Sequence, residues 1–433
     1  MEKQILSLIE EKKYTRLREC LEELNPADIA LILEEAELKD LPVVFRILPK
    51  ELAAEVFVEM DRDLQQHLIE SFSNTELKDV LDELFMDDMV DIVDEMTASV
   101  AKRILKQTDA KTRKMINQLL AYPDDSAGSI MTTEYVDLKK NMTVDEAFDH
   151  IREIGLDTET IYTCYVMDRG RHLLGIVTVK DLLLNPKTCI LSDIMDENII
   201  FANTLDDKEE VAGQFEKYDL MALPVVDKEN RLVGIITVDD AIDVIQEEAT
   251  EDIEMMAAIL PSEKSYLKTG VFATFKARIP WLMFLMISAT FTGAIISSFE
   301  GRLTKWMALI AFIPMLMGTG GNSGSQSSVT VIRGLSTGEI EFKDIWRVIW
   351  KELRVSVVCG VVLGIVNFIN LYLVVHLWLN NFDDGVYLTE MLAVSLTVVL
   401  VVIVAKLVGS VLPIVAKKLG ADPAVMASPL VTT

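Results

Sequence analysis

The chain has 433 residues, half of them hydrophobic, and a formal net charge of −27 at pH 7. The charge is uneven: residues 1–270 hold 59 acidic and 29 basic side chains, whereas residues 271–433 hold 9 and 12. So acidic a surface argues against nucleic acid as a partner, because phosphate binding requires a basic face. The length allows two to four domains, and the composition predicts an acidic soluble part followed by a nearly neutral apolar part.

Residues 1–125 are predicted to form an acidic helical domain. Apolar residues recur at helical spacing in runs of ten to twenty residues, separated by short polar or Pro-containing joints. We expect a stack of short amphipathic helices, an α-helical superhelical N-terminal domain. The turn-forming sequence YPDDSAGS at 122–129 ends it.

An internal repeat predicts two similar α/β units, at 126–190 and 191–246. IMTTE at 130–134 is similar to IMDEN at 194–198, and LLGIVTVKDLL at 173–183 is similar to LVGIITVDDAI at 232–242. Each copy ends in a strand followed by T-x-x-D, at Thr178–Asp181 and Thr237–Asp240. This pattern resembles tandem CBS domains.

The rest of the chain is predicted to be helical and largely within a membrane. Residues 247–270 form a connecting helix, and residues 271–433 an all-α transmembrane domain. Long apolar runs, uncharged except for Lys406 in the fourth, predict spans at Trp281–Ser298, Trp306–Val331, Val355–Leu379 and Met391–Val415, and a fifth that begins near Ala424. Lys and Arg gather before the first span, between the second and third, and after the fourth, which places residues 1–270 in the cytosol.

The most specific motif is PMLMGTGGNSGSQSSVTVIRG at 314–334. Its glycines let helix backbones approach closely, and its polar side chains require water or a partner helix, because lipid offers them no hydrogen bonds. Mg²⁺ sheds its water reluctantly, so a pore for this ion would be lined by hydroxyls, amides and carbonyls that contact the bound water. A tight helix-packing seam without transport remains the alternative on chemistry alone.

A second constellation is the segment 239–252, with seven carboxylates and no basic residue. On a helix its acidic residues fall close to one face, where like charges repel unless a cation bridges them. A solvated acidic face is the alternative.

The P-x-x-x-GTGGN-x-G-x-QS motif, following two CBS units and an acidic helical domain, resembles the MgtE magnesium channels over essentially the whole chain. The resemblance implies a homodimer with its pore between the subunits, and cytosolic domains that bind Mg²⁺ and close the gate. It also implies a plug helix in the connecting segment. Matched residue by residue, the family's metal-binding positions fall on acidic residues in four places: the helical domain, the second CBS unit, the plug helix and the C-terminal Asp-Pro sequence. The resemblance implies that Glu216 acts through its backbone carbonyl. The backbone of Ser129 is a further candidate. The full set of metal-site candidates is Glu55, Asp87, Asp91, Glu209, Glu216, Asp219, Asp240, Asp243, Glu248, Glu251, Asp252 and Asp422. As a simple helix N-cap, Asp422 would serve a structural role as well.

The resemblance implies a fifth span whose pore aspartate would lie beyond residue 433, so we expect a fragment with a truncated fifth helix. The pore-lining candidates within the chain are Asn322, Ser325, Gln326, Ser428 and Thr432. We predict a multi-pass protein of the inner cell membrane that imports Mg²⁺, with ATP as a possible regulator at the CBS pair. No enzymatic motif is present, so no enzyme activity is expected. A non-conducting membrane-tethered CBS sensor, or a transporter of Co²⁺ or Mn²⁺, remains the alternative.

Overall fold

The computed structural model describes the whole chain except residues 1, 262–265, 267–268, 304–306, 379–387 and 425–433. The chain divides into two compact units, Met1–Ile245 and Gln246–Thr433. Each is described by itself.

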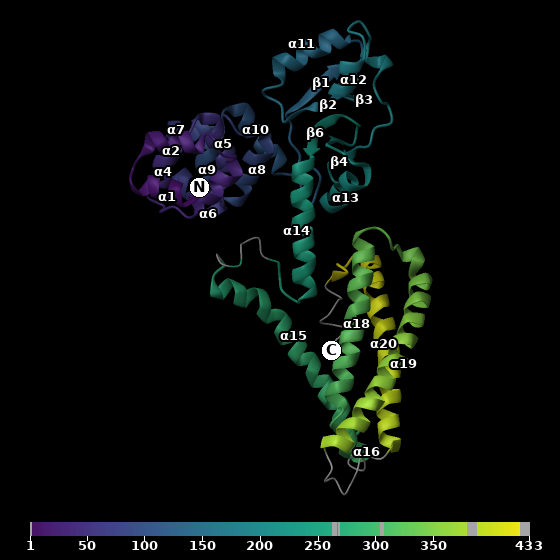
Figure 1. The fold of residues 1–433 in the computed structure, drawn as a ribbon. Helices are drawn as coiled ribbons and strands as arrows, with labels where there is room; N and C mark the ends of the chain where they lie inside the picture. The colour runs from purple at the N-terminus through teal and green to yellow at the C-terminus, as the bar shows by residue number, and fades with distance from the viewer. Residues whose placement is uncertain (1, 262–265, 267–268, 304–306, 379–387, 425–433) are drawn as a thin grey trace. The chain divides into compact units, whose positions relative to one another are not determined.

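The first unit begins with a stack of short helices, as predicted (Figure 1). Short polar residues start several of them: the Asn25 side chain caps α3, and Ser73 forms a reciprocal capping box with Glu76 at α7. Apolar residues at helical spacing face inward, so Leu17, Leu33 and Phe57 are fully buried. The helices are α1 Glu2–Glu10, α2 Tyr14–Leu21, α3 Pro26–Glu34, α4 Leu41–Phe45, α5 Lys50–Val58, α6 Arg62–Ser71, α7 Asn74–Leu81, α8 Met86–Glu95, α9 Ala98–Gln107 and α10 Ala110–Leu119.

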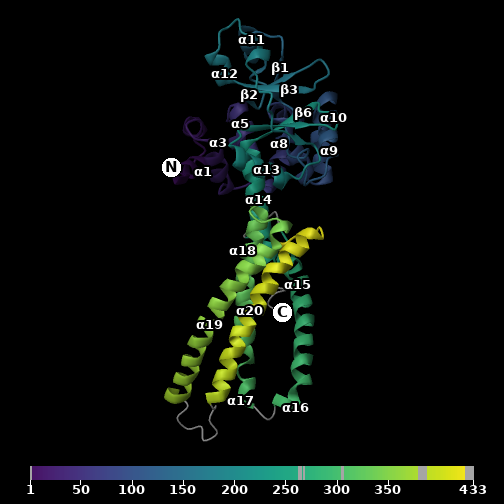
Figure 2. The same cartoon turned by 90° about the vertical axis from the view of Figure 1, so that its right-hand side faces the viewer.

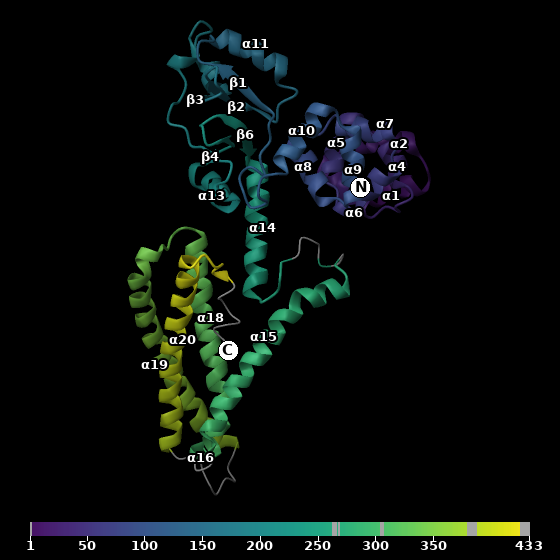
Figure 3. The ribbon, with the colours of Figure 1, turned by 180° about the vertical axis from the view of Figure 1, so that it is seen from behind.

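The internal repeat folds as two small sheets of the same topology (Figure 1 and Figure 3). In each sheet the first strand is parallel to the second, and the second is antiparallel to the third. The first copy comprises β1 Tyr135–Lys139, α11 Val144–Ile154, β2 Thr160–Met167, β3 Leu173–Thr178 and α12 Val179–Leu184. The second comprises β4 Ala202–Asn203, α13 Lys208–Tyr218, β5 Ala222–Val226, β6 Leu232–Thr237 and α14 Val238–Met256.

The T-x-x-D ending of each copy is a helix cap. Thr178 and Asp181 form a capping box at the start of α12. In the second copy the Asp240 carboxylate accepts a hydrogen bond from the Thr237 hydroxyl at 2.7 Å, at the start of α14. The motif therefore turns a buried strand directly into a helix, and it fixes the position of Asp240.

One hydrophobic core runs from the helical stack into the second CBS copy, because Val93 and Ile104 belong to the same buried cluster as Phe215, Leu223 and Ile236. α14 begins in the first unit at Val238 and continues without interruption to Met256, so the acidic segment 239–252 is a single helix, as predicted.

The second unit is helical. Its elements are α15 Val271–Ser298, α16 Glu300–Leu303, α17 Met307–Ile310, α18 Ile313–Ser336, the short 3₁₀ turn Phe342–Asp344, α19 Ile345–Trp378 and α20 Leu388–Lys418. α18, α19 and α20 lie side by side in both views (Figure 1 and Figure 2).

Among the described residues, three helical segments are long and apolar enough to cross a membrane: Val271–Ser298, Phe342–Leu373 and Leu388–Lys418. They contain the first and fourth predicted spans and, up to Leu373, the third. The second predicted span, 306–331, is wrong as one continuous helix: α17 ends at Ile310, and α18 starts at Ile313 and runs on to Ser336. The small and polar residues of α18 keep it out of the apolar set.

Candidate functional site

An acidic cavity of about 480 Å³ lies in the first unit. Its carboxylates come from α5, α8, the residue before β2 and the start of α14. Within the described chain, no basic residue lines it. The lining residues are Asn25, Pro26, Glu55, Val58, Glu59, Asp87, Asp88, Glu159, Asp239 and Asp240.

Two helix starts position the central carboxylates. The backbone N–H of Met86, the first residue of α8, donates to Glu134 Oε2 at 3.1 Å, so a residue preceding β1 caps this helix. Asp87 then falls in the first turn of α8 and is only 9% exposed. Asp240 falls in the first turn of α14. Negative charge is favourable at a helix N-terminus, which partly offsets the crowding of these carboxylates.

Burial and mutual repulsion disfavour the charged forms of these groups. Burial, and then the charge of Asp240, raise the pKa of Asp88 to about 7. Burial, and then Asp88, raise the pKa of Glu159 to about 8. The pKa of Asp240 rises to about 6 through burial, although the bond from Thr237 opposes that rise. Burial also raises the pKa of Asp87 well above its usual range. A cation in the cavity would relieve this repulsion.

The cavity suits a hydrated cation better than a bare one. Within the described part of the chain, no group of three His, Cys, Asp or Glu side chains is placed to hold a metal ion directly. Six waters of an octahedral Mg²⁺ ion, at roughly 30 Å³ each, fit the available volume. Glu159 Oε2 is a buried oxygen without a hydrogen-bond partner among the described residues, so it is free to accept from such a water.

Sequence reasoning found Glu55, Asp87 and Asp240 but missed their neighbours. α8 begins MDDMVD and α14 begins VDDAID, so each carries an Asp–Asp pair followed by a third Asp. That shared pattern was a usable signal for Asp88 and Asp239. Glu159 had no signal in the sequence, because only the fold brings the start of β2 to α8.

The other predicted ligands of the first unit do not line this cavity. Asp91 is exposed on α8. Burial, and then the charge of Asp239, raise the pKa of Asp243. Glu209, Glu216 and Asp219 are exposed at the two ends of α13, where Asp219 takes a left-handed conformation with φ of 52°. The Ser129 hydroxyl donates to the backbone carbonyls of Asp124 and Ser126. These candidates stay predictions.

In the second unit the end of α14 and the C-terminal Asp-Pro sequence are close enough to interact. Burial, and then the charge of Asp422, raise the pKa of Asp252, while the Ser336 hydroxyl donates to its carboxylate at 3.3 Å. Asp422 accepts from the backbone N–H of Ala424 at 2.7 Å, and the helix that it was considered to cap lies outside the described residues. Glu248 and Glu251 are partly buried on the same helix. Two carboxylates that repel each other here form a second candidate cation site.

α18 presents two different faces. Ser323, Ser327 and Val331 are buried against the neighbouring helices. Asn322 and Gln326 are exposed in the single chain, and Ser325 lies between the two faces. The side chains of Asn322 and Gln326 are therefore accessible to a pore or to a partner helix. Ser428 and Thr432 lie outside the described residues.

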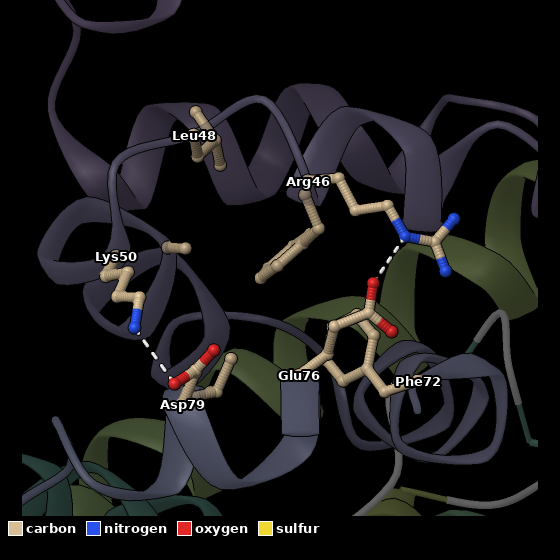
Figure 4. Close-up of a pocket in the computed structure, with 9 residues that line it drawn as sticks. Arg46, Leu48, Lys50, Phe72, Glu76 and Asp79 are labelled. Atoms are coloured by element: carbon tan, nitrogen blue, oxygen red, sulfur yellow. Dashed lines mark hydrogen bonds and ion pairs between the residues drawn. The ribbon is translucent and has the colours of Figure 1, made fainter. Parts of the chain in front are cut away.

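A smaller cavity of about 240 Å³ lies within the helical stack (Figure 4). Arg46 Nε contacts Glu76 at 2.6 Å and Lys50 Nζ contacts Asp79 at 2.9 Å, beside Phe72 and Leu48. The hydrogen bond from Arg46 is the main cause that lowers the pKa of Glu76, to about 2. Because each cation already has its carboxylate, this cavity offers no unmatched charge to a ligand.

Comparison with known proteins agrees with this organisation. The family model described as "MgtE intracellular N domain" matches residues 24–125, CBS domain models match 127–186 and 191–247, and the MgtE model described as "Divalent cation transporter" matches 313–433.

Relatives match at nearly full length. The chain is 36% identical over 420 residues to the magnesium transporter MgtE of Thermus thermophilus, covering 96% of this chain and 91% of that one. It is 33% identical over 433 residues to the magnesium transporter MgtE of Bacillus subtilis, covering 99% and 92%. A crystal structure described as the cytosolic domain of the Mg²⁺ channel MgtE in complex with ATP matches with a TM-score of 0.54 at 34% identity, covering 56% of this chain and all of that chain.

Helical acidic domain, CBS pair and apolar helices together define a membrane transport protein with a large soluble part. The chain belongs to the MgtE family of magnesium transporters. The predicted family, fold class and transport of magnesium are confirmed. The family is a transporter and not an enzyme class.

Proposed function

We propose that this protein is a gated Mg²⁺ channel of the inner cell membrane, which imports Mg²⁺ and is closed by Mg²⁺ bound to its cytosolic acidic sites. The observation that carries the proposal is the cavity of Asp87, Asp88, Glu159 and Asp240, whose charges are matched by no basic residue in the described lining. At low cytosolic Mg²⁺ the ionised carboxylates repel one another and loosen the helical domain from the CBS pair. At high Mg²⁺ a hydrated ion bridges them.

The electrostatic interaction of Asp252 with Asp422 supports a second place at which Mg²⁺ would act, within the unit that holds the apolar helices. Asp252 belongs to α14, the same helix that begins with Asp240. One helix therefore carries carboxylates of both candidate sites, so cations bound at either would restrain the same element. Coupling between metal binding and gating of about 1–3 kcal/mol is the usual range for an allosteric link.

We infer that the protein works as a homodimer in the lipid bilayer. Asn322, Gln326 and Thr330 form an exposed polar row on α18 at i, i+4 and i+8 in a single chain. Lipid would leave these groups without hydrogen bonds. A second copy facing this row would enclose a polar path. α15 has no buried residue in the single chain either, so its surface is available to lipid and to a partner.

We propose ATP as a regulator at the CBS pair, supported by the matching cytosolic domain that was crystallised with ATP. The proposal includes no catalysed reaction.

Mg²⁺ uptake into proteoliposomes that contain the whole protein, in the presence of competing Co²⁺ or Mn²⁺, tests the transport proposal. Uptake of Mg²⁺ that falls when Mg²⁺ is raised on the cytosolic side is expected. Flux of Co²⁺ or Mn²⁺ in preference to Mg²⁺ would assign another cation, and a protein that binds Mg²⁺ without any flux would be a sensor.

A further inference from the structure

One hydroxyl group in the membrane helices lies between two buried opposite charges. Ser327 of α18 donates to Glu352 Oε2 of α19 at 2.6 Å and accepts from Lys406 Nζ of α20 at 3.3 Å. Ser327 is 2% exposed, Lys406 6% and Glu352 9%. The three helices lie side by side, so this three-residue bridge joins all of them at one level (Figure 1 and Figure 2).

Either charge alone would be unfavourable at this buried position. An ionised side chain buried within membrane-spanning helices is costly unless an opposite charge and hydrogen bonds compensate it. Here the Ser327 hydroxyl donates to the anion and accepts from the cation, so it links both with correct hydrogen-bond polarity. Removing only Lys406 would leave the Glu352 carboxylate buried beside a single hydroxyl, where it would attract a proton, water or a metal ion.

The bridge lies one residue from the polar row of α18. Residue 326 faces away from the packed helices and residue 327 faces into them. α18 also packs very closely on α20: a Cβ at Gly409 would clash with the Gly324 carbonyl oxygen. Such glycine contacts let the two helix backbones approach closely. The bridge adds a directional constraint, because hydrogen bonds from one residue of α18 to two other helices oppose both rotation and sliding of α18.

We propose that Glu352, Ser327 and Lys406 form a charge-compensated bridge that fixes the rotation of α18, so that Asn322 and Gln326 face the ion path. Lys406 is the internal counter-ion that keeps Glu352 from acting as a competing cation site. The three are positioning residues, since they act on the ion path through α18. The proposal rests on the proposed channel function for its effect on flux, but not for its effect on helix orientation.

The first test measures Mg²⁺ uptake by proteoliposomes at several Mg²⁺ concentrations, normalised to folded protein. Lys406→Met should lower the maximal rate by at least about tenfold, because it leaves one buried charge unpaired. The apparent KM should stay within about twofold, since the groups that meet the ion are unchanged. The double variant Lys406→Met with Glu352→Gln should recover most of the rate. Lys343→Met, which breaks an exposed pair with Glu341, is the matched control and should have no effect.

The second test does not depend on flux. In a protein whose four cysteines are replaced, single cysteines at positions 326 and 323 are modified with a water-soluble thiol reagent. Position 326 should react faster than 323. Lys406→Met should reduce that ratio at least about fivefold, a coupling typical of contacting groups, and the double variant should restore it. Ser327→Ala, which keeps both charges, should give an intermediate ratio even if Lys406→Met folds poorly.

An unchanged ratio and rate in both Lys406→Met and Ser327→Ala would overturn the proposal. A double variant no better than Lys406→Met would also overturn it. If the wild-type protein moves no Mg²⁺ but the cysteine ratio responds as expected, the channel proposal fails and the bridge stands.

Discussion

Replacing Asp88 by Asn should stabilise the first unit when no Mg²⁺ is present. Asp88 lines the acidic cavity, and its pKa lies at about 7. One pKa unit corresponds to about 1.4 kcal/mol, so the rise from the usual value near 4 sets roughly 4 kcal/mol as the upper limit on its penalty. Because Asp87, Glu159 and Asp240 share the same repulsion, a gain of about 1–3 kcal/mol is expected for one removed charge.

The sign with pH follows from linkage. A carboxyl whose folded-state pKa lies above its unfolded value binds more protons when folded, so its contribution to stability is lost as the pH rises through about 7. The advantage of Asp88→Asn over the wild type should therefore grow between about pH 6 and pH 8, by about 1 kcal/mol. Millimolar Mg²⁺ at pH 8 should stabilise the wild type more than the variant. The reason is that Mg²⁺ neutralises the Asp88 charge in the wild type, whereas the variant has no such charge to neutralise.

Thermal unfolding of residues 1–256 in EDTA and in Mg²⁺ provides the assay, since the cytosolic domain of a relative crystallised by itself. A gain of about 1–3 kcal/mol should raise the midpoint by about 2–12 °C for a unit of this size. Asp94→Asn is the matched control, because Asp94 is exposed near the end of the same helix. A destabilised Asp88→Asn variant in EDTA at pH 8, or an equal gain from Asp94→Asn, would refute the reasoning.

Asp252→Asn and Asp422→Asn should each weaken the Mg²⁺ dependence of closure, measured as the cytosolic Mg²⁺ concentration that halves uptake; the same concentration in both variants and the wild type would count against this site. Asp240→Asn should remove most of the Mg²⁺ protection of residues 1–256 from limited proteolysis, and cleavage that Mg²⁺ still slows as in the wild type would contradict the bridging role. A single cysteine placed at Asn381 should be labelled from outside whole cells and one at Lys343 should not, because Lys and Arg gather on the cytosolic side. The reverse labelling pattern would invert the topology.

Local patterns carried most of the fold prediction. Three patterns depend only on residues close together in the sequence: helical spacing of apolar residues, the repeated T-x-x-D ending and the long apolar runs. The structure confirms them as amphipathic helices, helix caps and long apolar helices, respectively. The break before α18 was missed because hydropathy registers the apolar run around 306–316 but not the turn between Ile310 and Ile313. Apolar character alone does not locate a helix start.

The candidate site was only partly readable from the sequence. The family resemblance supplied Glu55, Asp87 and Asp240, and Asp240 also stands in the conspicuous acidic segment 239–252. The cavity also needs Glu159, which precedes β2 and is distant from α8 in the sequence, so only the folded first unit brings the two together. The bridge of Ser327, Glu352 and Lys406 was equally hidden, because its members are separated by 25 and 79 residues along the chain.

The central claim is that Mg²⁺ bound at the acidic cavity closes a Mg²⁺ pathway, and one measurement tests it most directly. Mg²⁺ flux through the whole protein in liposomes is followed while Mg²⁺ on the cytosolic side is raised from micromolar to millimolar, for the wild type and for Asp87→Asn with Asp240→Asn. The account predicts that flux through the wild type falls steeply and that flux through the double variant persists. Flux that falls equally in both proteins would contradict it.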